Sequence, residues 1–389
     1  MLLLYISYVL GVLFLSLKVF HTADWHLGSE MSYLGAKADS RRYEMLATFK
    51  NAVDYCKENG VSVFLIAGDL FDSNKAAEDF APSVFEYIKN AADIKFFYVA
   101  GNHDPLDAAS AMNGDNIPEN LYLFGTDYEI KEFSEEGFRI IGRSFPHSSM
   151  EPKPFNTVIP DDGLVNIMLL HADAGADRSS PYNPIDRDFI ENSGVDYLAL
   201  GHIHKRTSPA KFGKTTFTYS GSPEGHGFDE EGIRGGYLAE ISKASCNLTF
   251  VRLNRRTHRV LKVDISEASS SIRAADLIIQ KLSDDLGEAF TDDLYKIVLT
   301  GGVAEDVTLK KVEILQILAD RLYFVKVKDK TKKAYDLDTL KNETTLRGVF
   351  VKKMCEKIEK AEGTELELLN AALELGLAAF DSEVAYSED

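Results

Sequence analysis

Cysteine is scarce in this chain, which has three cysteines among 389 residues. Cys56, Cys246 and Cys355 form no Cys-x-x-Cys pair, so nothing in their spacing indicates a paired-thiolate metal or redox motif. We interpret them as structural thiols in a reducing compartment, and we therefore expect a cytoplasmic protein.

Positive charge is also in short supply. The 43 lysines and arginines face 61 acidic residues, the net charge is −18, and no Lys or Arg follows Lys360. Taken alone, this balance argues against a nucleic-acid binder, which usually presents a basic face. Bound divalent cations would offset several carboxylates. Local basic clusters, each either a solvated face or a contact region, remain at Arg41-Arg42, Lys205-Arg206, 252–259 and 326–333.

No apolar run reaches the length of a typical membrane span. Residues 1–17 are almost wholly apolar, but about 20 residues are needed to cross a bilayer. The run lacks the basic leading region and small-residue cleavage site of a signal peptide. Because Lys18 opens the first predicted strand without a linker, we expect residues 1–17 to come from a misassigned start. The alternative is a membrane anchor; membrane association is otherwise not expected.

Five short apolar runs are each followed at once by Asp, Asn or His. The most telling ends in Gly101-Asn102-His103-Asp104, after the strand-like residues 94–100. In open α/β sheets, ligands bind at the carboxyl ends of strands, so these side chains are expected to converge at one edge. The other runs lead into Asp24-Trp25-His26, Gly68-Asp69, His171 and Gly201-His202-Ile203-His204.

The order of predicted elements favours an α/β fold. Residues 18–101 alternate strand, helix, strand, helix, strand, which indicates a partly parallel sheet covered by helices. From Leu121 short strands dominate, and a two-sheet sandwich with helices outside accounts best for them. We expect a hairpin at 128–133 and 138–142, and antiparallel strands at 215–219, 236–241 and 247–252.

A second, smaller α/β module is predicted after residues 259–264, followed by helices at 346–360 and 365–380. Phe350, Met354 and Ile358 form one apolar stripe, which is either ordinary core or a partner surface. The predicted organisation is an extension at 1–17, the core domain at 18–262, a capping α/β domain at 263–335 and C-terminal helices at 336–389.

The polar residues at the strand ends have the chemistry of metal ligands. In extended chain, residues i and i+2 point the same way, so Asp24 with His26, and His202 with His204, should each face one side. Imidazole, carboxylate and amide ligands without thiolate suit manganese, iron or zinc. There are too many for one ion, but two ions about 3.5–4 Å apart and bridged by a carboxylate would use them and activate a water.

Taken singly, a histidine at a strand end is more often a structural residue than a metal ligand. His21 is expected to pack beneath the site and Trp25 to lie in the core, although a tryptophan can also stack on a base. His147, His226 and His258 lie outside the motifs, and His226 is a candidate for lining the cleft.

The motifs Asp-x-His, Gly-Asp-x-x-Asp, Gly-Asn-His-Asp, a lone His and Gly-His-x-His, in this order, resemble those of the calcineurin-like metallophosphoesterases. The resemblance covers Lys18 to about Arg259 and implies a β-sandwich flanked by helices that binds two metal ions, expected to be Mn²⁺. It implies that His103 contacts the phosphate. Asp104 and Asp72 are candidates for orienting His103 or a ligand, with capping of the following turn as the alternative, and Asp104 is also counted among the catalytic candidates. One metal would be held by Asp24, His26, Asp69 and His204, and the other by Asp69, Asn102, His171 and His202.

Residues 21–28, 219–223 and 228–230 resemble SbcD-type DNA-repair nucleases, most closely their YhaO-like branch. This resemblance implies a DNA exonuclease and endonuclease of double-strand-break repair. Its expected partners are DNA, an SMC-like (SbcC-like) ATPase that docks on the C-terminal helices, and a possible second copy in a homodimer. One departure is Asp72, where archaeal and eukaryotic relatives have a histidine, so the role of Asp72 is open.

Two other functions remain open. The acidic net charge favours a phosphoesterase for small phosphate esters or cyclic nucleotides. A non-catalytic DNA-end scaffold is the third possibility, against which the complete ligand set argues.

Overall fold

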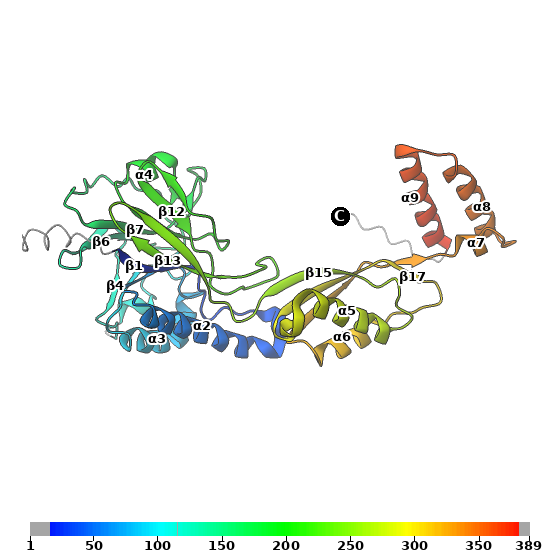
Figure 1. The fold of residues 1–389 in the computed structure, drawn as a ribbon, viewed down its shortest axis with the longest axis horizontal. Coiled ribbons are helices and arrows are strands. Elements are labelled where there is room, and N and C mark those ends of the chain that lie inside the picture. The colour runs from blue at the N-terminus through cyan, green and yellow to red at the C-terminus, as the bar shows by residue number, and fades with distance from the viewer. Residues whose placement is uncertain (1–15, 115, 381–389) are drawn as a thin grey trace, which may run out of the picture. The chain divides into compact units, whose positions relative to one another are not determined.

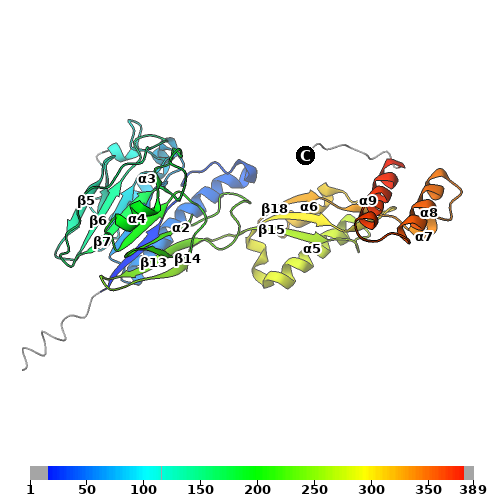
Figure 2. The same ribbon diagram turned by 90° about the horizontal axis from the view of Figure 1, so that it is seen from above.

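The structure is a computed structural model that describes residues 16–114 and 116–380, so the predicted extension lies almost wholly outside the described residues. The described chain forms two compact units (Figures 1 and 2). The first contains the residues up to Val260 together with Asp292–Tyr295, and the second contains Leu261–Thr291 and the residues from Lys296 onward. Among the described residues, no helix has the length and apolarity that spanning a bilayer requires.

The first unit contains a six-stranded sheet in the order β14-β13-β1-β2-β3-β4. Strands β1 to β4 run parallel, whereas β13 and β14 are antiparallel neighbours on the other side of β1. The predicted β-α-β-α-β order and parallel pairing are therefore confirmed. The bounds are β1 Leu17–Thr22, α2 Ala38–Glu58, β2 Val63–Ala67, α3 Asn74–Lys89, β3 Lys95–Val99, β4 Leu121–Leu123, β13 Gly235–Ile241 and β14 Cys246–Arg252.

Helix α2 illustrates how the sequence pattern produces this layer. Leu46, Phe49, Val53 and Cys56 recur at helical spacing, and all four are buried. The chain leaves the helix through Gly60, whose φ of 65° suits a residue without a Cβ. This turn lets β2 begin directly after α2, so the strand's carboxyl end carries Asp69 into the site.

The second six-stranded sheet has the order β11-β12-β10-β7-β6-β5. The predicted hairpin is confirmed, with β5 and β6 antiparallel around Gly137. The expectation for residues 215–219 is only partly right, because β12 is antiparallel to β11 but parallel to β10. In the sequence β11 comes between β10 and β12, but in the sheet it lies at the edge, on the other side of β12. The bounds are β5 Glu129–Phe133, β6 Phe138–Arg143, β7 Val165–His171, β10 Tyr197–Gly201, β11 Ala210–Phe212 and β12 Thr215–Tyr219.

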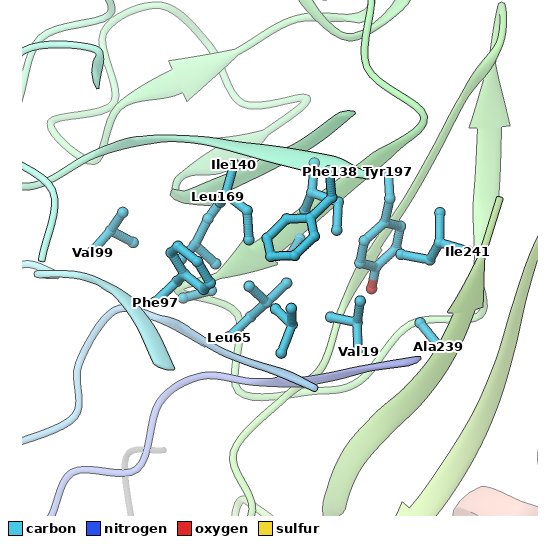
Figure 3. Close-up of a cluster of buried hydrophobic side chains, with 14 of the residues drawn as sticks. Val19, Leu65, Phe97, Val99, Phe138, Ile140, Leu169, Tyr197, Ala239 and Ile241 are labelled. Atoms are coloured by element: carbon cyan, nitrogen blue, oxygen red, sulfur yellow. The ribbon is translucent and has the colours of Figure 1, made fainter. Parts of the chain in front are cut away.

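The two sheets enclose a shared apolar core (Figure 3). Val19 and Leu65 from the first sheet and Ile140 and Leu169 from the second are all completely buried. Each such side chain contributes roughly 1.5–3 kcal/mol when removed from water, so this packing holds the sheets face to face. The predicted two-sheet α/β sandwich is confirmed.

Short elements join these strands. They are η1 Ser32–Lys37, η2 Ala111–Asn113, β8 Asp173–Ala174, β9 Pro184–Ile185 and α4 Arg187–Asn192.

The second unit has a three-stranded sheet in the order β15-β16-β18, with α5 and α6 packed against each other. Phe350, Met354 and Ile358 pack against a small core that includes Val351 and Leu373, so the apolar stripe of α8 contributes to packing within the unit. The bounds are β15 His258–Asp264, α5 Ser271–Leu286, η3 Gly287–Asp292, β16 Leu294–Thr300, β17 Gly302–Ala304, α6 Lys311–Ala319, β18 Phe324–Asp329, β19 Lys332–Ala334, α7 Leu337–Leu340, α8 Leu346–Ile358 and α9 Gly363–Phe380.

Candidate metal centre

Backbone hydrogen bonds join the loops that follow β1 and β2. The amide of Asp24 donates to Gly68 O and the amide of His26 donates to Asp69 O, each at 3.0 Å. These bonds place the Asp-x-His motif directly beside Asp69. The convergence of these two strand ends, which the sequence predicted, is therefore present in the structure.

Several of the predicted ligands have left-handed backbone conformations. Asp24, His26, Asp69 and His202 have φ values of 53°, 43°, 50° and 103°. Such conformations cost about 1–3 kcal/mol in non-glycine residues and cluster at functional sites. The prediction that these pairs lie in extended chain is wrong, because the strands end before the motifs and the ligands occupy tight turns.

Two glycines allow the loops to approach closely. A Cβ at Gly68 would lie 2.2 Å from His171 Nδ1, and a Cβ at Gly101 would lie 2.1 Å from Asp69 Oδ1. No side chain fits at either position without moving a candidate ligand. Gly68 therefore permits the second motif to meet the fourth, and Gly101 permits the third motif to meet the second.

Asp69 lies between the two halves of the candidate centre. Its Oδ2 atom is 3.6 Å from His26 Nε2 and 3.4 Å from His171 Nε2. Its Oδ1 atom accepts a hydrogen bond from the amide of His103 at 2.9 Å. This position suits the bridging carboxylate of a two-metal site.

The first half consists of Asp24, His26 and His204. Each offers a ligand atom within 4.8 Å of those of the other two. His26 Nε2 and His204 Nε2 are 3.1 Å apart, and Asp24 Oδ2 is buried with no hydrogen-bond partner among the described residues. An unpaired buried carboxylate oxygen is costly, so these donors fit a divalent cation.

The second half is built around His171. His171, Asp24 and Asp69 also offer ligand atoms within 4.8 Å of one another. Asn102 Oδ1 lies 3.0 Å from His171 Nε2, and the ring of His202 lies 5.2 Å from that of His171. The expectation that His202 and His204 face one side is wrong, because the turn at His202 sends the two rings to different halves.

His103 is the most exposed member of the cluster. Its ring lies edge-on to that of His26 at 4.6 Å, and its Nδ1 lies 3.1 Å from the carbonyl oxygen of Asp72. The side chain is therefore held on the exposed edge of the cluster.

Asp104, unlike His103, is buried. Its carboxylate accepts hydrogen bonds from the amides of Phe71 and Gly101 and from the hydroxyl of Tyr98. These contacts fix the loop that carries Asn102 and His103. Asp104 therefore positions the loop. Among the described residues its carboxylate makes no hydrogen bond to His103, and its catalytic role stays a prediction.

The electrostatics of the centre favour cations. Burial raises the pKa of Asp24, although nearby histidines oppose the shift. Burial also disfavours charge on Asp69, but His171, His26 and His103 together hold its pKa below the ordinary value. Burial lowers the pKa of His26, yet Asp72, Asp69 and Asp24 outweigh it and raise that pKa to about 9. The surplus of negative charge is what a divalent ion would neutralise.

Glu230 is a site residue that motif analysis did not single out. Its Oε1 accepts a hydrogen bond from His204 Nδ1, and its Oε2 accepts one from the amide of His226 at 3.0 Å. Burial disfavours the Glu230 carboxylate, but its bond to His204 and nearby positive charge hold its pKa far below the ordinary value. Such a carboxylate orients a metal-binding imidazole. In the sequence, Glu230 lies in the segment 228–230 that carries part of the resemblance, but nothing there assigned it a role at the metal centre.

The other histidines and Trp25 occupy distinct environments. His21 is completely buried, with its Nδ1 2.7 Å from the Tyr197 hydroxyl, and Trp25 packs edge-on against Phe49 in the core. Both placements agree with the prediction. His147 is exposed, His258 is buried near Tyr33, and His226 lies beside His26. Asp72 Oδ1 lies 3.5 Å from His26 Nδ1.

Comparison with known proteins agrees with this geometry. Residues 17–206 match the family described as calcineurin-like phosphoesterase. The chain is similar to the uncharacterized metallophosphoesterase YhaO of Bacillus subtilis (strain 168), at 30% identity over 267 residues, which cover 65% of this chain and 64% of that protein. The match thus spans less than two thirds of that relative.

Two further likenesses cover different shares of the chain. The DNA double-strand break repair protein Mre11 of Sulfurisphaera tokodaii is 24% identical over 373 residues, which cover 90% of this chain and 91% of that protein. A crystal structure of a dimetal phosphatase from Danio rerio aligns with a TM-score of 0.36 and 11% identity, covering 63% of this chain and 100% of that one.

Proposed function

We propose that residues 17–206, which match the calcineurin-like phosphoesterase family, form the catalytic domain of a metal-dependent DNA nuclease of double-strand-break repair. The observation that carries the proposal is the position of Asp69 Oδ2 between His26 and His171. Two divalent ions, for which manganese is proposed, would supply a nucleophilic water and polarise the phosphate when bound. His103, exposed beside them, would contact the phosphate and protonate the leaving oxygen.

A cationic groove next to the centre supports DNA as the substrate. Lys205 and Arg206 follow His204 directly, are exposed, and line a groove of about 440 Å³. The Arg206 guanidinium lies 3.9 Å from the centre of the Phe250 ring, which holds it in place. Although the chain as a whole is acidic, these two side chains offer charge of the sign that a phosphate backbone needs. The likeness to an Mre11 protein points the same way.

The exposed leucines of the C-terminal helices support a protein partner. Leu346 on α8 and Leu368 and Leu375 on α9 are 76%, 70% and 60% exposed. Leu368 and Leu375 are seven residues apart and so lie on one side of α9. This apolar surface is the proposed docking site for a helix of an SMC-like ATPase. Replacing the two exposed leucines Leu368 and Leu375 with glutamate should abolish co-purification with that ATPase while leaving DNA cleavage by the isolated chain intact.

The decisive experiment is digestion of end-labelled DNA by the purified chain in Mn²⁺, with and without the ATPase and ATP. His103→Ala should slow cleavage roughly 10²–10⁴-fold without lowering the metal content, whereas His147→Ala, at an exposed histidine outside the clustered ligand groups of the described residues, should cleave normally. Sedimentation of the same protein tests the proposed homodimer.

Two outcomes would replace the proposal. If the chain hydrolyses a small phosphodiester through His103 but never shortens DNA, a phosphoesterase for small substrates becomes the better function, as the net charge of −18 favours. If fewer than one ion binds per chain and nothing is hydrolysed, a DNA-end scaffold becomes the better function.

A further inference from the structure

His226 belongs to none of the five motifs, yet its ring lies against two candidate metal ligands. The ring is edge-on to His26 at 5.2 Å and tilted against His204 at 5.9 Å. Both of its ring nitrogens are buried and have no hydrogen-bond partner among the described residues. An imidazole that serves packing alone would have no need of either nitrogen.

Hydrogen bonds to the same side chain hold both His226 and His204. One carboxylate, that of Glu230, accepts hydrogen bonds from both the His204 ring and the His226 amide. Arg234 supports the same turn by donating to the carbonyl oxygens of His204 and Glu230. The position of His226 is therefore fixed by the same contacts that orient a candidate ligand.

Two unpaired nitrogens in a buried ring are unfavourable, because each has lost water without gaining a partner. A phenylalanine would fill the same space without that cost. Retaining a histidine here makes physical sense if a nitrogen gains a partner when the centre is loaded.

We propose that His226 contributes a ring nitrogen to metal binding at the half of the centre formed by Asp24, His26 and His204. The contact runs through one water molecule, because the nitrogens of His226 do not join the described groups whose ligand atoms lie within 4.8 Å of one another. The inference rests on the proposed function only in requiring that this half binds a divalent ion.

The test compares His226→Phe, which keeps a ring but removes both nitrogens, with His226→Gln, which keeps a hydrogen-bonding group. Mn²⁺ binding is measured by calorimetry and by the loss of the free-ion electron paramagnetic resonance signal. His226→Phe should weaken binding of one of the two ions roughly 10–100-fold, while His226→Gln should retain most of the affinity. His147→Phe, at an exposed histidine, is the matched control and should bind like the wild type.

Stability in chelator gives a second, independent measurement. Because His226→Phe removes two unpaired polar atoms from a buried position, the metal-free variant should melt at or above the temperature of the wild type. Higher metal-free stability combined with weaker metal binding is a signature that a packing role would not produce.

Wild-type affinity in His226→Phe would overturn this inference alone. Equal losses in His226→Phe and His226→Gln would also overturn it, since the nitrogen would then be irrelevant. A wild-type chain that binds no Mn²⁺ would overturn both this inference and the proposed function, so the two failures are distinguishable.

Discussion

The carboxylate of Glu230 accepts a hydrogen bond from Nδ1 of His204, and this contact directs Nε2 of His204 toward His26. The bond also fixes the tautomer of His204, because the proton must sit on Nδ1 and leaves the lone pair of Nε2 free for a metal ion. The contact with Glu230 thus sets both the orientation and the tautomer of His204.

Glu230→Gln should weaken metal binding and phosphodiester hydrolysis roughly 10–100-fold, because the amide keeps the shape of the side chain but loses the charge. The measurement is Mn²⁺ affinity together with kcat/KM on a small phosphodiester. Glu231→Gln, at the adjacent exposed glutamate, is the control and should behave as the wild type. Equal effects in both variants would show that general charge, and not the bond to His204, matters.

Asp69→Asn should remove both ions, because the Asp69 carboxylate lies between the two halves of the centre. The loss of affinity should exceed the roughly 10–100-fold typical of a residue that only orients a ligand. Elemental analysis of the purified protein gives the number of ions per chain. Asp79→Asn, on the exposed side of α3, should retain the wild-type metal content, and a variant of Asp69 that did so would refute the bridging role.

Replacing Lys205 and Arg206 with alanine should weaken DNA binding and lower its dependence on salt. Each lost phosphate contact should reduce the slope of log affinity against log salt by about 0.7–0.9. The control replaces Lys57 and Lys89, which end α2 and α3 beside the amino ends of β2 and β3, away from the site. If the salt dependence of DNA affinity is unchanged in the Lys205/Arg206 variant, the groove does not bind DNA.

The stability of the first unit should fall in mild acid because of His258. Burial lowers the pKa of His258 from 6.5 to about 4. In the unfolded chain this histidine is protonated below about pH 6.5, whereas in the native chain it is protonated only below about pH 4. The free energy of unfolding therefore decreases as pH falls between these values. This single group should cost roughly 2 kcal/mol between pH 7 and pH 5.

Urea unfolding in chelator at pH 7 and pH 5 measures this loss. His258→Phe keeps a ring against Phe228 and Tyr33 but cannot titrate, so its loss between the two pH values should be smaller than that of the wild type. His147→Phe should keep the wild-type loss. Identical losses in all three proteins would assign the acid sensitivity to other groups.

Local sequence determined much of this protein. Apolar runs that stop at Asp, Asn or His identify the strands and the polar turns that follow them, because strand propensity and turn chemistry act over a few residues. Helical spacing of residues such as Phe49 and Val53 was enough to predict α2. The ordered motifs were likewise enough to predict which side chains gather around Asp69.

Tertiary structure decided how those residues divide between two halves. His202 and His204 are two residues apart, but the positive φ of His202 turns their rings toward His171 and His26 respectively. His226 lies against His26, 200 positions away in the sequence, and Glu230 bonds His204 from the same segment, which leads into β13, the neighbour of β1. No periodicity encodes such an approach, since it depends on the packing of two sheets and not on the residues beside it in the chain.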